Sequence, residues 1–393
     1  MLPLKHKAVN WIDGMKISKD HFIQQEFFYT DQIRDAAAGQ LSRINYGLLS
    51  PVDESGKTLN VKINVDPAKV IRVDLLECHA ITSNGERIEI ATNNAIKLNN
   101  DQDKLVADFD YTESREKTFY VVVSVNLFSR NPVGQMDPDE IPARYPFVTP
   151  QYTVEILPES QISSSENSIL LIGKLQLIAG RMQVDNKFIP ACIAVKNHPL
   201  LHEAYYNLGN QLGETANLNL SIVQNVHAKS QLTSMVKSFL ALSEKVSDFF
   251  ASELGRFRWI IADLPPVFFV EYFIRFAYII KFSLERLPAK DKEELMSYFS
   301  EWTEVSVSDM NDKITKMIRT EYNHDDIAQS LNVAEEFMSM IYSLFQKLNS
   351  LDFLGKKKGE RAFIQEKPLV SEKESETAKK EQRKNWSFLP DEP

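Results

Sequence analysis

The chain has 393 residues, which is enough for about two or three domains. Its composition, 43% hydrophobic and 25% charged with 13 glycines and 17 prolines, excludes a fibrous or low-complexity protein. A net charge of -9 gives no long-range attraction for phosphate backbones and argues against nucleic-acid binding. The first residues contain no apolar run with a cleavage site, so we expect no secretory signal and a cytoplasmic protein.

The chain opens with a dense aromatic segment, residues 8–33. From Asp20 onward its apolar residues recur at helical spacing, and Ser18 or Asp20 offers an N-cap. The stripe of this predicted helix contains Phe22, Gln25 or Glu26, Tyr29, Ile33, Ala36, Leu41 and Ile44. Trp11 and Met15 precede the helix and are expected in an arm or hairpin laid on the next domain. Either this segment is a core helix with its arm, or it is a docking surface.

Residues 61–195 have the pattern of β-strands. Residues 69–81 and 87–91 flank Asn84-Gly85, a strong signal for a hairpin. Further short β-branched runs follow without helices between them, at residues 119–128, 151–157 and 168–178. This order predicts an antiparallel β-sandwich rather than a parallel sheet. Residues 129–150 contain five prolines and predict a long exposed loop, either a contact surface or a tolerated insertion.

After residue 201 the pattern becomes helical. No Gly or Pro occurs between Glu214 and Leu254, which predicts one helix of about 40 residues and roughly 60 Å. A heptad seam lies along it, formed by Leu232, Met235, Phe239, Leu242, Val246 and Phe249. The apolar segment 265–282 carries Glu271 and Arg275, which can pair on one helix face, and it predicts a buried bundle helix rather than a membrane span.

A second seam closes the helical region, formed by Ile327, Leu331, Ala334, Met338, Ile341, Phe345 and Leu348. Asp325 and Asp326 stand where acidic residues complement a helix N-terminus. Two interpretations of the seams remain: a bundle within one chain, or a bundle shared between subunits. The length of the first predicted helix favours the shared bundle, because one small domain cannot bury a solitary helix of that length.

The last residues, from 356 to 393, mix charges of both signs and predict a disordered tail. Three apolar residues stand near its end: Trp386, Phe388 and Leu389. They form either a short peptide that docks onto a partner or a chance apolar end. The resulting domain boundaries are 1–200 for the arm, helix and sandwich, 201–354 for the helices, and 355–393 for the tail.

The common catalytic motifs for phosphate, dinucleotide, acyl-transfer and zinc-hydrolase chemistry are missing from the sequence. His198 and His202 have helical spacing but no third ligand nearby, so we predict no metal site. Cys78 and Cys192 stand far apart without a Cys-x-x-Cys motif, which supports neither a disulfide framework nor a zinc site and favours a reducing compartment.

Two other sets of residues have side chains that could act as a nucleophile or as a general acid and base. Cys78 and His79 are adjacent on a strand, where neighbouring side chains point to opposite faces, so a buried cysteine is the better interpretation. The carboxylates Asp137, Asp139 and Glu140 lie in the predicted loop, where nothing in the sequence indicates desolvation. We therefore predict that the protein is not an enzyme and needs no cofactor.

Three stretches carry a resemblance to a known family. Residues 11–25, WIDGMKISKDHFIQQ, followed by Tyr46-Gly47-Leu48, resemble the N-terminal signature of the TssK family of type VI secretion baseplate proteins. Residues 186–201 resemble the exit of that family from its β-domain, and residues 322–327, YNHDDI, resemble its late Tyr-x-His-Asp-Asp motif. The chain departs from the signature at four positions: Asp13 for Glu, Lys19 for Pro, Ile23 for Gln and Tyr46 for Trp.

The resemblance implies an α+β fold and a structural role. TssK-like proteins are cytoplasmic homotrimers with an N-terminal β-sandwich "shoulder" similar to phage receptor-binding proteins and a helical "neck" that trimerises. The shoulder docks on the wedge proteins TssF and TssG, and a C-terminal head reaches the membrane complex. After Leu351 this chain has only the charged tail, which indicates a shortened, divergent branch in which the tail replaces the head as a tether and the membrane partner is open.

The resemblance turns the opening segment into a predicted partner surface. We expect Trp11, Met15 and Phe22 to be its anchors, because aromatic and Met residues dominate interface cores. Gly14 would allow a tight turn there, and His21 is expected to form a structural hydrogen bond rather than to bind a ligand. A phage-type receptor-binding or tail protein of the same architecture, and an unrecognised enzyme, are the alternatives.

Overall fold

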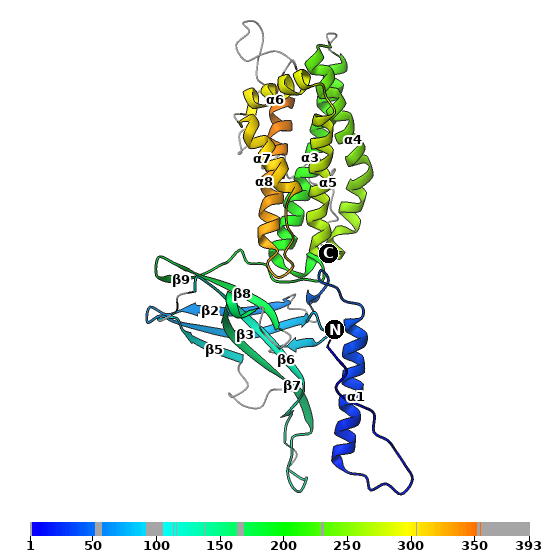
Figure 1. Cartoon of the computed structure of the whole chain (residues 1–393), viewed down its shortest axis with the longest axis vertical. Helices are drawn as coiled ribbons and strands as arrows, with labels where there is room; N and C mark the ends of the chain where they lie inside the picture. Colours follow the sequence, from blue (N-terminus) through cyan, green and yellow to red (C-terminus); the bar gives the residue numbers. More distant parts are fainter. Residues whose placement is uncertain are drawn as a thin grey trace. The chain divides into compact units, whose positions relative to one another are not determined.

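The structure is a computed structural model that describes residues 2–51, 57–91, 105–162 without 113, 115 and 137, 169–228, 232–351 without 304, and 354. The chain forms two compact units. The first, which we call the β unit, comprises Met1–Leu200 and His324–Ala328; the second, the helical unit, comprises Leu201–Asn323 and Gln329–Pro393. The fold is α+β, with antiparallel sheets in the first unit and helices in the second (Figure 1).

The first sheet is organised around one long strand, β3 (Val70–Ile81). Along one edge, β3 pairs antiparallel with β2 (Leu59–Val65) and then with the short β1 (Gly47–Leu48). Along its other edge it pairs with β5 (Leu105–Asp110) and β4 (Arg87–Ile90). The predicted Asn84-Gly85 turn is confirmed between β3 and β4, and Gly85 has a φ of +83°.

The second sheet has the order β7-β6-β8-β9 within the described residues. Its strands are β6 (Thr118–Val133), β7 (Phe147–Pro158), β8 (Ile169–Ile178) and β9 (Arg181–Val184). A short helix, α2 (Glu159–Ile162), follows β7, and the turn η2 (Val195–Asn197) precedes the helical unit. The rings of Phe109 on β5 and Phe119 on β6 lie 5.4 Å apart, so the two sheets contact each other through aromatic side chains.

The long loop predicted for residues 129–150 is wrong in part. After a register shift beyond Asn126, the strands β6 and β7 pair again, with Val133 opposite Phe147. Figure 1 shows this hairpin extending beyond the rest of the sheet. Proline has no N–H to donate to a neighbouring strand. It is tolerated here because β7 lies at the sheet edge, and because β8 pairs with β6 only between Thr118 and Ser124, so this part of β6 has no second strand to bond with.

The opening helix, α1, spans Lys19–Ala38, with Gly39 as its C-cap, and so ends several residues before the predicted end. The core-helix alternative for the predicted stripe is wrong, because Phe22, Tyr29 and Ile33 have exposed fractions of 61%, 57% and 70%. The buried residues of α1 are instead Asp31, Arg34 and Ala38. The turn before β4 explains why this side of α1 is buried, because Gly85 lies against the backbone of Arg34 and Ala38.

The single 40-residue helix predicted for the helical unit is wrong. The chain forms α3 (Pro199–Ala228) and α4 (Ser234–Trp259), and the Thr233 hydroxyl caps α4 by accepting a hydrogen bond from the Val236 N–H. The two helices pack side by side, since the Asn219 amide donates to the Ser243 carbonyl over 3.0 Å. The ring of Tyr205 on α3 also stacks on the ring of Phe257 on α4 at 5.0 Å, so folding back brings apolar side chains of the two helices into contact.

The remaining helices complete the helical unit: η3 (Ile261–Asp263), α5 (Pro266–Glu285), α6 (Ala289–Thr303), α7 (Val307–Ile318) and α8 (Ala328–Asn349). The predicted bundle helix 265–282 is confirmed as α5, and its Arg275 lies 3.6 Å from Glu271 and 2.5 Å from Glu253. Across the described part of the chain, no helix is long and apolar enough to span a membrane.

The predicted seam residues are buried in the structure, with the exception of Leu232. Leu232 lies outside any helix and is 46% exposed, which corrects its assignment to the first seam. All other seam residues are at most 5% exposed: Met235, Phe239, Leu242, Val246, Phe249, Ile327, Leu331, Ala334, Met338, Ile341, Phe345 and Leu348. They are buried within one chain. The shared bundle remains a prediction.

Candidate functional site

The N-terminal arm, residues 2–17, is held against α1 by a buried ion pair. The Asp31 carboxylate accepts hydrogen bonds from the backbone N–H groups of Lys5 and His6, at 2.5 and 2.9 Å. Arg34 lies 3.0 Å from Asp31 and donates to the carbonyls of Leu2 and Pro3. Both charged side chains are nearly inaccessible to solvent. We call this pair the arm latch, because it fixes the backbone of the arm through charge-assisted hydrogen bonds.

The arm and α1 are also attached to the extended β6–β7 hairpin. The His6 ring lies 5.0 Å from the Phe27 ring and 4.4 Å from the Phe128 ring. Further along, Glu26 forms an ion pair with Arg130. Aromatic packing and this ion pair therefore join an arm, a helix and a hairpin that are distant in sequence into one part of the β unit.

The five residues predicted for docking lie together where the arm turns into α1. Gly14 has a φ of +78°, in a turn closed by a hydrogen bond of 3.2 Å from the Met15 N–H to the Ile12 carbonyl. The Trp11 ring then lies 6.0 Å from His21 and 6.2 Å from Phe22. The expected turn at Gly14 is confirmed, and only a residue that tolerates positive φ fits it without strain.

His21 has the predicted structural hydrogen bond. The Ser18 N–H donates to its Nδ1 atom over 3.1 Å, and the Ser18 hydroxyl lies 3.2 Å from the same atom. Because Nδ1 accepts the backbone proton, it is not free to bind a metal. Ser18 and His21 thus close the first turn of α1 in the manner of a capping box.

The arm and α1 expose a set of large apolar side chains, which we call the N-terminal face: Trp11, Ile12, Ile17, Phe22, Tyr29 and Ile33. Their exposed fractions run from 47% for Trp11 to 70% for Ile33. Trp11 and Phe22 lie together in this set, and contiguous exposed apolar side chains mark interaction sites on protein surfaces. The sequence indicated Trp11 and Phe22 here, but it missed Ile12 and Ile17, whose only signal was their place beside the Gly14 turn.

A second feature, which the sequence did not indicate, is the meeting of three separate stretches in the β unit. We call it the motif junction, and it consists of residues 46–48, 189–197 and 324–327. The Leu48 N–H donates to the Ala191 carbonyl, and the Leu48 carbonyl accepts from the N–H of Ile193 and the amide of Asn197, at 2.8, 3.1 and 2.8 Å. The Ile327 N–H donates to the Ile189 carbonyl over 3.1 Å.

Gly47 makes this approach possible. It has a φ of +107°, and a Cβ atom at this position would lie only 2.0 Å from the Ala191 carbonyl oxygen. The backbone of the first stretch therefore contacts the backbone of the second with no room for a side chain. Any other residue would have to separate the two stretches.

The polar side chains of the junction join its first and third stretches. The Tyr46 hydroxyl donates to Oδ1 of Asp325 over 2.5 Å, and the His324 Nε2 atom lies 2.9 Å from the Tyr46 carbonyl, to which it donates. Burial, with the charge of Asp325 and its hydrogen bond, raises the pKa of Tyr46 far above its usual value. Burial also lowers the pKa of His324, against the opposing effects of the Tyr46 carbonyl and Asp325. Both groups are therefore neutral at pH 7.

The neighbouring Asp326 is held by the second sheet. Its carboxylate lies 2.6 Å from the Lys174 ammonium on β8, and both side chains are less than one fifth exposed. Burial disfavours the charge of Lys174, but the hydrogen bond and charge of Asp326 outweigh it and raise the pKa of the lysine. Asp325 and Asp326 thus bind the segment before α8 to the β unit through two separate partners.

Those residues considered for chemistry that the structure describes are not gathered into a reactive site. Cys78 and Cys192 are fully buried, and burial raises the pKa of the Cys78 thiol to about 12. Burial lowers the pKa of His198 to about 4. Glu140 pairs with Arg144 at 2.6 Å on the surface, while Asp137 lies outside the described residues. Among the residues that the structure describes, no three His, Cys, Asp or Glu side chains form a group able to hold a metal ion.

The tail residues Trp386, Phe388 and Leu389 lie outside the described part of the chain, so their docking stays a prediction.

Comparisons with known proteins give distant structural similarity. No family model and no curated protein matches the chain. It is similar to a crystal structure of TssK with 13% identity and a TM-score of 0.48, over 87% of this chain and 69% of that one. It is also similar to a chain of the TssK-TssF-TssG baseplate subcomplex, with 13% identity and a TM-score of 0.45, over 86% and 99% of the two chains.

A chain of a baseplate complex from the type VI secretion system gives a TM-score of 0.47 with 14% identity, over 72% of this chain and 91% of that one. These solved structures are of TssK or of type VI secretion baseplate complexes.

Proposed function

We propose that this protein is a TssK-like structural adaptor of a type VI secretion baseplate, a homotrimer that joins the TssF and TssG wedge to the membrane-anchored complex. It has no catalytic role in this proposal. The β unit is the shoulder, with its two sheets packed as a sandwich, and the helical unit is the neck. In this role the protein lies on the cytoplasmic side, at the secretion apparatus.

The observation that carries the proposal is the motif junction. The three stretches that resemble the TssK family lie far apart in sequence, and parts of all three are bonded to one another in the fold. Tyr46 contacts His324 and Asp325, and Leu48 bonds with Ala191. If the three sequence resemblances were due to chance, we would not expect their residues to bond to one another in the fold. Residues that maintain an architecture shared with a family are expected to do so.

The N-terminal face supports the choice of the docking surface. Its side chains are exposed while their backbone is fixed by the arm latch and the capping box, so binding a partner would cost little ordering entropy. Trp11 and Phe22 have the size and apolar character of interface anchors. We infer that the wedge proteins bind here, with the apolar face of the partner covering the turn at Gly14.

The mass of the purified chain in solution tests the proposal. Light scattering after size exclusion would be measured for the chain alone and for the chain co-expressed with TssF and TssG. A particle of about three times 45.0 kDa that moves to a larger complex with these partners is the expected result. A monomer that binds neither partner would overturn the adaptor role and leave the resemblance as common ancestry.

A further inference from the structure

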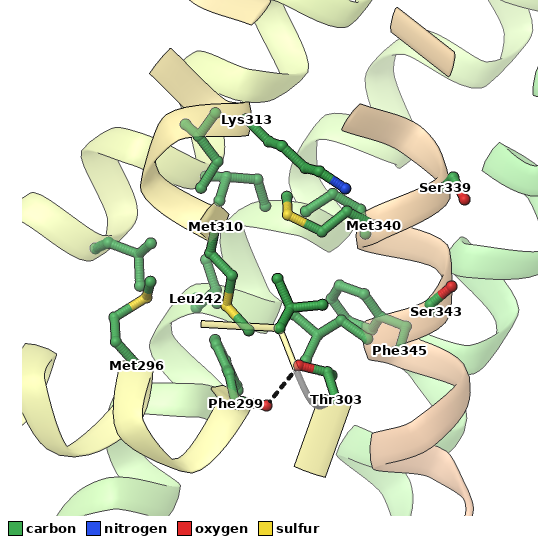
Figure 2. Close-up of a pocket in the computed structure, with 16 residues that line it drawn as sticks. Leu242, Met296, Phe299, Thr303, Met310, Lys313, Ser339, Met340, Ser343 and Phe345 are labelled. Atoms are coloured by element: carbon green, nitrogen blue, oxygen red, sulfur yellow. Dashed lines mark hydrogen bonds between the residues drawn. The ribbon is translucent and has the colours of Figure 1, made fainter. Parts of the chain in front are cut away.

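The helical unit contains a cavity of about 240 Å³ between α4, α5, α6, α7 and α8 (Figure 2). It lies entirely within this unit and is far in sequence from the N-terminal face. Its inner lining is apolar and buried, and includes Leu242, Met296, Met310, Met340 and Phe345. Three methionines around one space are notable because the unbranched thioether adapts to ligands of irregular shape.

The rim of the cavity has a different character. Lys313 is half-buried and is the one charged residue among the described residues that line the space. Figure 2 shows its side chain extending toward Met340, with the amine close to the apolar lining. On the same helix, Lys316 pairs with Glu336 at 2.8 Å, whereas Lys313 forms no ion pair with a described residue. A cation beside an apolar space is suited to an anionic headgroup on an apolar body.

The volume limits the size of the ligand. An apolar cavity of about 150 Å³ accommodates a benzene molecule, so about 240 Å³ has room for roughly eight to ten carbon atoms. A long-chain lipid is too large, and a small anion such as phosphate would leave the methionines without contacts. Figure 2 shows the Ser339 and Ser343 hydroxyls on the side of α8 that points away from the space, so Lys313 is the group left to bind an anionic headgroup.

We propose that this cavity binds a straight-chain carboxylate of about eight to ten carbons, with the chain among Met296, Met310 and Met340 and the carboxylate beside Lys313. Such a ligand would fill a space between five helices and stabilise their packing. Binding would therefore couple the order of the helical unit to the presence of the ligand, independently of the N-terminal face.

Octanoate and methyl-labelled methionine test this on the full chain. The ¹³C-methyl signals of Met296, Met310 and Met340 would be assigned by Met→Leu substitutions and followed by NMR during an octanoate titration. We expect saturable shifts of these three signals while methionines outside the cavity, such as Met136, stay unchanged. The neutral 1-octanol should bind more weakly and the cationic octylammonium should not bind, because Lys313 selects the anion.

Substitutions at the rim test the role of the charge. Lys313→Gln should weaken octanoate binding about five- to tenfold and leave 1-octanol within about twofold, and Lys313→Arg should retain octanoate binding. Lys316→Gln, on the same helix, is the matched control and should have no effect. Unmoved methyl signals at millimolar octanoate in the folded protein would overturn the proposal, as would equal binding of octanoate to the Lys313→Gln variant.

Discussion

The hydroxyl of Tyr46 donates a hydrogen bond of 2.5 Å to the carboxylate of Asp325, across 279 positions of sequence. The rings of Tyr46 and His324 lie 4.7 Å apart in the same place. The segment before α8 is thus part of the β unit, although the chain on both sides of it belongs to the helical unit. This return of the chain brings the third stretch of the motif junction into contact with the other two.

Removing the hydroxyl should therefore cost stability. Tyr46→Phe leaves the Asp325 carboxylate without this donor, and we expect the free energy of unfolding to fall by about 1.5 to 3 kcal/mol in urea denaturation. A double-mutant cycle with Asp325→Asn should give a coupling energy above about 1 kcal/mol. Tyr278→Phe, at an exposed tyrosine on α5, is the control and should change stability by less than about 0.5 kcal/mol. Equal effects of the two Tyr→Phe changes would contradict the role of the hydrogen bond.

The close contact at Gly47 predicts a difference between two glycines. Gly47 and Gly180 both have positive φ, at +107° and +76°, but only at Gly47 would a Cβ meet another backbone. Gly180→Ala should cost about 1 kcal/mol through backbone strain alone. Gly47→Ala adds a clash with Ala191 and should cost at least about 3 kcal/mol or prevent folding. Thermal unfolding of both variants would measure this, and similar losses would show that the two stretches are not in contact.

The arm latch predicts local release of the N-terminus. Asp31→Asn removes the charge that holds the backbone of Lys5 and His6 and leaves Arg34 buried without its partner. Trypsin cleavage after Lys7 and Lys16 should become at least about tenfold faster under native conditions, since cleavage follows the population of the open form. Asp35→Asn, one turn further along α1, is the matched control. Cleavage at the wild-type rate in Asp31→Asn would show that other contacts hold the arm.

The N-terminal face predicts loss of binding without loss of folding. Trp11→Ala and Phe22→Ala should each weaken binding of the wedge proteins about tenfold or more, while the free energy of unfolding changes by less than about 1 kcal/mol. Phe282→Ala is the control, because Phe282 is 64% exposed but lies on α5 in the helical unit. Binding would be measured by interferometry with purified TssF and TssG. Unfolding of the Trp11→Ala variant would instead assign Trp11 to the core.

The half-buried His198 predicts that acid destabilises the protein. Its pKa is lowered by burial from about 6.5 to about 4, so the unfolded chain binds this proton more readily than the folded one. The stabilisation is complete above about pH 6.5 and is lost as the pH falls toward 4, by up to about 3 kcal/mol. His198→Asn should flatten the dependence of the unfolding free energy on pH between 7 and 4, and His202→Gln should not. A slope unchanged in His198→Asn would assign the acid sensitivity to other groups.

Local patterns in the sequence were sufficient for several elements. Ser18 marks the start of α1, Asn84-Gly85 marks the turn between β3 and β4, and Glu271 with Arg275 marks one face of α5. Each of these depends on residues within about four positions of one another, and capping, turn geometry and helical spacing act at that range. The types of these three elements were therefore predictable from the chain alone.

Other features depended on contacts that no local pattern contains. The spacing of Phe22, Tyr29 and Ile33 indicates a helical stripe equally well whether it faces a core or solvent, and the packing of Gly85 against α1 decided the direction. The heptad spacing of Met235 and Phe239 likewise indicates a buried seam but not the helix that covers it.

By itself, the sequence determined the α+β composition, the antiparallel strands, the turn at Gly14 and the helical character of the second half. Only the tertiary structure decided where α3 ends, which face of α1 is exposed, and that Tyr46 meets Asp325. The physical reason is that backbone propensity is a property of neighbouring residues, whereas burial depends on which surfaces lose water together when distant parts of the chain come into contact.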